Sequence, residues 1–160
     1  MKTDIFFLHG LESSGSGTKG RFLGQHFPHV IRPDFSGSLS NRLEQLKKLC
    51  CGSSSLILIG SSYGGLMATC FASDYPQSVV KLILLAPALN YESYHPPAEP
   101  STIPTILIIG QHDTVTPPNP VIPLAEATFS NLDTRIMDDD HLLHKSFKSL
   151  DWQEMLAPVS

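Results

Sequence analysis

Residues 60–64 read GSSYG, and this stretch places Ser62 at the centre of a G-x-S-x-G pattern. The pattern is typical of a strand that turns sharply into a helix and presents a serine hydroxyl at the apex of the turn. Glycines two positions before and after the apex leave room for the strand and the helix to approach each other. Ser61 is the alternative, but its neighbours at those two positions are Ile59 and Tyr63. We therefore predict that Ser62 is a nucleophile.

A serine hydroxyl becomes an effective nucleophile when a base removes its proton, and histidine is the usual base. Among the seven histidines of the chain, His141 closely follows the last apolar run, so it can reach the ends of the predicted strands. His144 is the alternative base, although its position one helical turn later favours a place on the predicted final helix. His9 is expected to hold its own loop through a hydrogen bond. We predict His141 as the base.

A carboxylate must orient such a histidine and stabilise the imidazolium that forms. Asp113 follows the apolar run Thr105–Ile109 in the stretch GQHDTVTP. A turn or helix-cap aspartate is the ordinary interpretation, but a place after a strand favours the role of the acid. The run Asp138–Asp140 lies too close to His141 in the chain to be preferred. We expect this run to cap the final helix or to form a solvated turn.

Acyl transfer also needs hydrogen-bond donors for the negative charge that develops on the carbonyl oxygen. One donor is expected from the backbone N–H of Tyr63, because it directly follows the predicted nucleophile at the start of a helix. The other is expected from the loop after the first apolar run, where the sequence reads His9-Gly10-Leu11. We predict that the backbone N–H of Leu11 is this second donor.

These residues need a scaffold that brings them together, and the chain carries six short apolar, β-branched runs. The central runs are apolar throughout, as strands covered on both faces must be. The predicted strands are Asp4–Leu8, Val30–Pro33, Leu56–Ile59, Val79–Leu85, Thr105–Ile109 and Thr134–Met137. The predicted helices are Lys19–Phe27, Leu39–Cys50, Gly65–Asp74, Val121–Ser130 and His144–Met155. Residues 86–103 are rich in proline and tyrosine, and a short helix or a loop is expected there.

Strands that alternate with helices predict an α/β fold with a mainly parallel sheet of about six strands and helices on both faces. In open sheets of this kind, ligands bind outside the carboxyl ends of the strands. Ser62, Asp113 and His141 each follow a predicted strand. We therefore expect the three side chains to meet at one edge of the sheet.

The composition fits a single domain, since 160 residues is an ordinary domain length. The net charge of −4 and the absence of a basic run argue against a nucleic-acid partner. No apolar run approaches the roughly 18 residues of a membrane span. The N-terminus carries no secretory signal pattern, and three cysteines form no disulfide framework, so we expect a cytoplasmic protein. No zinc-ligand spacing is present, and we expect no metal and no organic cofactor.

The stretches FFLHG, GSSYGG, IIGQHD and DDDH, in this order, resemble the motifs of α/β-hydrolases over nearly the whole chain. The order Ser62, Asp113, His141 is the order of the triad in that superfamily. The stretch LHGLESSGSGTKGRFL is similar to the start of the small YqiA-type bacterial esterases, which lack a cap domain. The resemblance implies the same triad and the same oxyanion donors as above. The connection from Pro87 to Ile103 is far shorter than the roughly 50 residues of a folded cap, so no cap is expected.

The residues and the resemblance together predict a serine hydrolase that cleaves small carboxylic esters or thioesters through an acyl-enzyme, with a small-molecule ester as its partner. Tyr63, Tyr91 and Tyr94 are candidates for an apolar wall of the site, and ordinary packing is the alternative for the last two. Two other functions stay open. One is an acyltransferase on the same triad, in which an alcohol or an amine replaces water. The other is a non-catalytic binding module on the same fold.

Overall fold

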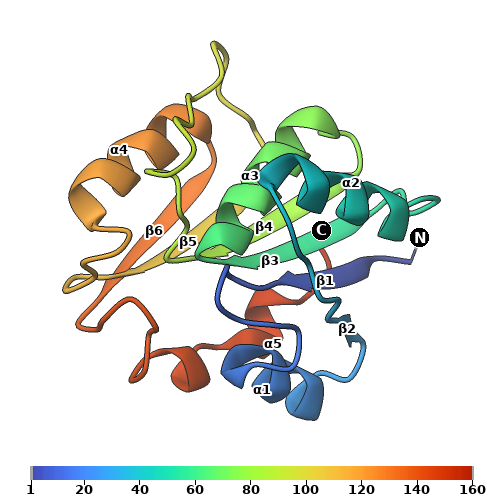
Figure 1. The fold of residues 1–160 in the computed structure, drawn as a ribbon, viewed down its shortest axis with the longest axis horizontal. Helices are drawn as coiled ribbons and strands as arrows, with labels where there is room; N and C mark the ends of the chain where they lie inside the picture. The colour runs from blue at the N-terminus through green and yellow to red at the C-terminus, as the bar shows by residue number, and fades with distance from the viewer. Residues whose placement is uncertain (1, 160) are drawn as a thin grey trace.

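The computed structural model describes residues 2–159, and a six-stranded sheet forms its centre (Figure 1). The strands lie in the order β2-β1-β3-β4-β5-β6, and every neighbouring pair is parallel. Their bounds are β1 Asp4–Leu8, β2 Val30–Ile31, β3 Leu56–Ser61, β4 Val79–Leu85, β5 Thr105–Gly110 and β6 Leu132–Met137. The predicted α/β fold with a parallel sheet of six strands is confirmed.

Helices cover both faces of this sheet (Figure 1). Their bounds are α1 Thr18–His26, α2 Leu39–Leu49, α3 Tyr63–Asp74, α4 Pro118–Thr128, the 3-10 helix η1 Phe147–Ser149 and α5 Trp152–Met155. The buried hydrophobic side chains of α2, α3 and α4 belong to one hydrophobic core, and those of α1 and α5 belong to the other. The sheet therefore separates two hydrophobic cores, as expected for a sheet with helices on both faces.

The alternation of side chains along the strands explains why the central runs are apolar at every position. In β3, Leu56 and Leu58 pack into the core with α3, whereas Ile57 and Ile59 pack into the core with α1 and α5. Successive side chains of a strand point to opposite faces, so a strand covered on both sides buries all of them. All four of these side chains are at most 1% exposed.

The predicted helix His144–Met155 is wrong. The structure has instead η1 and the four-residue α5. Leu150 between them is extended, with φ −66° and ψ 147°, and the side chain of Asp151 then accepts from the N–H of Glu154 as the N-cap of α5. An N-cap aspartate starts a new helix and does not continue an old one.

One residue of the acidic run before His141 differs from its prediction. Asp139 is buried, at 3% exposure, and its carboxylate accepts from the backbone N–H groups of Asp140, Lys145 and Ser146. It therefore holds the whole loop from 139 to 146 in place, and the prediction of a solvated turn or a helix cap is wrong for this residue. Side chains that bind nearby N–H groups in this way compete with helix formation, which accounts for the missing first turns of the predicted helix.

The connection between β4 and β5 contains turns and no helix, and no cap domain is present in the part of the chain that the structure describes. Helix α4 begins at Pro118, earlier than predicted, because a proline is well placed at the first position of a helix. No helix within residues 2–159 combines the length and the apolar character that a bilayer crossing requires.

The buried carboxylate of Asp139 gives a prediction about stability and pH. Burial by itself raises the pKa of Asp139, but hydrogen bonds from Ser146, Asp140 and Lys145 outweigh burial and lower it below its ordinary value. A lowered pKa means that the stabilisation is complete above the ordinary value of 3.8 and is lost as the pH falls through the folded-state value. We expect Asp139→Asn to lower the free energy of unfolding by about 1–3 kcal/mol at pH 7.

The measurement is urea unfolding of the wild type and of Asp139→Asn, followed by the fluorescence of Trp152. The difference in the free energy of unfolding between the two proteins should be largest near pH 7 and should decrease below about pH 4. The matched control is Asp138→Asn, because Asp138 is exposed and its carboxylate binds the exposed His112. A difference that is the same at pH 7 and pH 3 would contradict the role of the ionised carboxylate.

Candidate active site

Ser62 lies at the sharp turn between β3 and α3. Its backbone has φ 55° and ψ −116°, in a region that residues with a Cβ atom rarely adopt. Its N–H donates to the carbonyl of Leu85, and its own carbonyl accepts from the N–H of Ala88. The sharp turn predicted at Ser62 is therefore present, and backbone hydrogen bonds from β4 and from the loop that follows β4 hold it in place.

The two glycines of the motif provide the clearance that the turn needs. A Cβ atom on Gly64 would collide with the carbonyl groups of Leu8 and His9, and one on Gly60 would collide with the backbone of Gly64 and Gly65. All of these contacts are with backbone atoms, which do not move aside as the end of a side chain does. The strand and the helix can approach this closely only because both positions are glycine.

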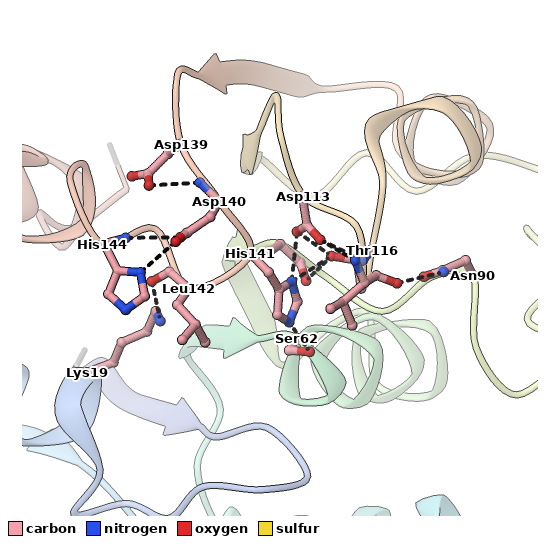
Figure 2. A network of polar contacts seen from close by, with 12 residues as sticks. Lys19, Ser62, Asn90, Asp113, Thr116, Asp139, Asp140, His141, Leu142 and His144 are labelled. Carbon is pink, nitrogen blue, oxygen red and sulfur yellow. Dashed lines mark hydrogen bonds and ion pairs between the residues drawn. The ribbon is translucent and has the colours of Figure 1, made fainter.

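His141 joins Ser62 to Asp113 (Figure 2). The Nε2 atom of His141 lies 3.1 Å from the Oγ of Ser62, and its Nδ1 atom lies 2.7 Å from the Oδ2 of Asp113. The structure thus brings together all three side chains that the sequence selected, across 28 and 79 positions of the chain. No hydrogen bond links Ser61 to a histidine within the described residues.

The carboxylate of Asp113 is fully bonded. It is 4% exposed, and its Oδ1 atom accepts from the backbone N–H groups of Val115 and Thr116. Its Oδ2 atom is bonded to the hydroxyl of Thr116 and to the ring of His141. These hydrogen bonds fix the direction of the carboxylate, so the imidazole of His141 is held in one orientation.

Thr116 also belongs to this network, although no motif in the sequence indicates it. The residue is fully buried, and its Oγ1 atom lies 2.8 Å from the Oδ2 of Asp113, 3.1 Å from the Nδ1 of His141 and 3.1 Å from the carbonyl of Ala86. The hydroxyl carries one proton, and its shortest contact is with the carboxylate. The only signal in the sequence is the spacing D-x-x-T, which is common in turns where a threonine touches no site.

The two predicted oxyanion donors are unpaired in the part of the chain that the structure describes. The backbone N–H of Tyr63 lies at the first position of α3, and no described residue accepts from it or from the N–H of Leu11. Both residues line the cavity that contains Ser62. An N–H group without a partner at such a place is available to a ligand oxygen.

His9 holds the loop that carries Leu11, in agreement with its predicted role. Its side chain is 1% exposed, and its Nε2 atom accepts from the backbone N–H of Phe35. The proton must then reside on Nδ1, which donates to the carbonyl of Gly10 at 2.6 Å. The loop is therefore anchored to the segment after β2.

His144, the alternative base, lies on the surface and not on a helix. Its side chain is 66% exposed, and its Nδ1 atom lies 2.6 Å from the Oδ2 of Asp140. This contact with His144 lowers the pKa of Asp140. His144 makes no hydrogen bond with Ser62, so the geometry favours His141 over His144 as the partner of the serine.

A cavity of about 610 Å³ opens beside Ser62 and His141. Apolar side chains with large exposed fractions stand around it, namely Leu11 at 50%, Val115 at 42% and Leu142 at 53%. Tyr63 and Tyr91 also line it, whereas Tyr94 packs against the core and its hydroxyl bonds to Thr128. The predicted apolar wall therefore includes Tyr91 and Tyr63 but not Tyr94.

Residues that could hold a metal ion do not gather in this site. Within residues 2–159, no group of three or more His, Cys, Asp or Glu side chains is arranged around a common point.

A serine at a strand-to-helix turn, with an aspartate and a histidine after later strands of one parallel sheet, defines the class of α/β-hydrolases. The family model described as the alpha/beta hydrolase fold matches residues 11–102, which is more than half of the chain. The protein belongs to the α/β-hydrolase fold family.

Solved structures share this fold over most of the chain. A marine microorganism esterase has a TM-score of 0.77 at 16% identity, and the match covers 98% of this chain and 96% of that one. The alpha/beta hydrolase domain-containing protein 10 from mouse has a TM-score of 0.76 at 18% identity, with 90% and 84% covered. A thermophilic esterase from Thermogutta terrifontis has a TM-score of 0.69 at 16% identity, with 89% and 84% covered.

A comparison with curated proteins found no match. The resemblance to YqiA-type esterases stays a prediction.

Proposed function

We propose that the protein is a serine hydrolase that cleaves small carboxylic esters or thioesters through an acyl-enzyme intermediate. The observation that carries this proposal is the line of hydrogen bonds from the hydroxyl of Ser62 through both ring nitrogens of His141 to Asp113. A binding module has no need of three side chains connected by hydrogen bonds in this way. Membership in the family supports hydrolase chemistry, and the name esterase carried by two of the similar structures supports an ester as substrate.

The first half of the reaction forms the acyl-enzyme. The Oγ of Ser62 attacks the ester carbonyl while the Nε2 of His141 takes its proton, which is the established chemistry of such a triad. The carbonyl oxygen becomes an oxyanion, and the N–H groups of Tyr63 and Leu11 donate to it. His141 then gives its proton to the leaving alcohol or thiol as the tetrahedral intermediate collapses.

The second half repeats these roles with water. His141 removes a proton from a water molecule, which attacks the acyl group on Ser62, and the proton returns to Ser62 as the acid leaves. The carboxylate of Asp113 is held in place throughout by its four hydrogen bonds. Its charge stabilises the imidazolium that exists in both halves.

Labelling with a fluorophosphonate probe tests the nucleophile. Wild type should be labelled and should release acid from short-chain p-nitrophenyl esters, and Ser62→Ala should lose both the label and more than 99.9% of the rate, because it removes the attacking oxygen. The matched control is Ser61→Ala, which removes the neighbouring hydroxyl and should keep both.

Persistent labelling of Ser62→Ala, or loss of the label in Ser61→Ala alone, would overturn the assignment. A folded wild type that is not labelled and turns over no ester or thioester would favour the binding module. Wild type that transfers its acyl group to an added alcohol and releases no free acid would favour an acyltransferase.

The hydroxyl of Thr116 gives a second prediction. Thr116→Val keeps the shape of the side chain and removes one of the four hydrogen bonds of the Asp113 carboxylate. A hydrogen bond to a charged group contributes about 1.5–3 kcal/mol, so we expect kcat to fall about 10- to 100-fold while KM changes little. Thr116→Ser, which restores the hydroxyl, should recover most of the rate. An unchanged kcat in a folded Thr116→Val would show that Thr116 does not position the acid.

A further inference from the structure

The cavity beside Ser62 has one wall that the proposed hydrolysis does not use. On this wall Lys19 of α1 reaches across to the segment after His141, where its Nζ atom donates to the carbonyl of Leu142 at 2.8 Å (Figure 2). The same Nζ atom lies 5.5 Å from the centre of the Phe147 ring. The ammonium is thus fixed in position beside the residue that follows the proposed base.

This ammonium has no carboxylate partner. The ion pairs found within residues 2–159 at N···O distances of 4.0 Å or less do not include Lys19. Asp140 and Asp139 act on it electrostatically from farther away, and both carboxylates are already engaged, with the ring of His144 and with backbone N–H groups. The carbonyl of Leu142 uses one of the three N–H donors of the ammonium, which leaves two for a ligand.

Partial burial makes an anionic ligand favourable at this position. Burial lowers the pKa of Lys19, against the opposing effect of Asp140 and Asp139. An ammonium that has lost part of its water gains more from a bound anion than an exposed one does. Lys148 lines the same cavity and adds a second positive charge, while Glu12 is the one carboxylate among the cavity-lining residues that the structure describes.

The position of Lys19 selects which part of the substrate carries the anion. His141 must deliver a proton to the leaving oxygen, so the alcohol portion of the ester lies on the His141 side of the cavity. Leu142, to which Lys19 is bonded, is the next residue. Figure 2 shows Lys19 and Thr116 on opposite sides of His141. Lys19 lines the cavity, whereas Thr116 and Asp113 do not.

The geometry points to Lys19 as the binding site for a carboxylate on the alcohol portion of the substrate. This inference rests on the proposed function and deepens it: the substrate is an ester of a hydroxy acid, with a small or apolar acyl group against Leu11 and Val115. Two free N–H donors match the two oxygens of a carboxylate. A doubly charged phosphate fits less well, because Glu12 and a net charge of −4 oppose it.

The test compares two acetate esters that differ in one charge, 4-acetoxybenzoate and its methyl ester, with release of the phenol as the readout. We expect Lys19→Met to lower kcat/KM for 4-acetoxybenzoate about 10- to 100-fold. The decrease in kcat/KM for the methyl ester should be several-fold smaller. That smaller decrease is the effect of losing the hydrogen bond between Lys19 and Leu142. The ratio of variant to wild type within each ester cancels the difference in leaving-group reactivity.

Matched variants separate charge from structure. Lys19→Arg keeps the positive charge and should keep most of the preference for the anionic ester. Lys145→Met removes an equal charge from an exposed lysine outside the cavity. This variant should leave kcat/KM unchanged for both esters. Two further esters locate the anion: monophenyl adipate, with its carboxylate on the acyl side, and 4-acetoxyphenyl phosphate. For both of these esters, Lys19→Met should lower kcat/KM less than it does for 4-acetoxybenzoate.

If Lys19→Met lowers kcat/KM equally for the charged and the neutral ester, the inference is overturned. Lys19 then only holds the segment at Leu142 in place. A larger loss for the adipate ester or for the phosphate would overturn the assignment of the carboxylate to the alcohol side. If the wild type turns over none of these esters, the proposed function fails. If it turns them over without responding to Lys19→Met, only this inference fails.

Discussion

The positive φ of Ser62 is a local cost of about 1–3 kcal/mol that the surrounding structure must hold in place. The N–H and carbonyl groups of Ser62 are bonded to Leu85 and Ala88, so β4 and the loop after it fix the turn from one side. Gly60 and Gly64 let β3, α3 and the end of β1 pack against each other at backbone contact. The central strands are apolar on both faces because helices cover the sheet on both sides.

The other two residues of the proposed triad come from farther along the same edge. Asp113 follows β5, two strands away from β3, and His141 follows β6, which is the last strand of the sheet. His141 must therefore return across the end of β5 to reach Ser62. The loop that carries it does so in contact with Gly110, where a Cβ atom would lie 2.5 Å from the carbonyls of Asp139 and Asp140. After His141, the loop is held by the buried carboxylate of Asp139, which accepts from the N–H groups of Lys145 and Ser146.

Sequence was sufficient for the parts of this arrangement that follow from periodicity and from rigid local geometry. The strand Asp4–Leu8 and the strand Val79–Leu85 begin and end as predicted. His9 follows the first apolar run, and Pro87 closely follows the second. Ser62, Asp113 and His141 could be selected because each follows a strand of a parallel sheet, and the ends of such strands share one edge.

The parts that failed depend on contacts between distant segments or on competition within a loop. Thr116 touches Asp113, His141 and Ala86 at once, and nothing in a D-x-x-T spacing indicates three tertiary contacts. The helix predicted over 144–155 has a helical pattern, but the carboxylate of Asp139 takes the N–H groups of Lys145 and Ser146. Lys19 has ordinary helical surroundings in the sequence, and only the fold places its ammonium in the cavity beside His141.

In the proposed reaction, Ser62 forms a covalent bond to the acyl group of the substrate. The most direct measurement is mass spectrometry of peptides from enzyme that is acid-quenched within milliseconds of mixing with p-nitrophenyl acetate. We expect one acetyl group on the peptide that contains Ser62. Its level should be highest before the steady state, and it should be absent in Ser62→Ala. Ester turnover without any acetylated peptide, or with the acetyl group on another residue, would contradict the proposed reaction.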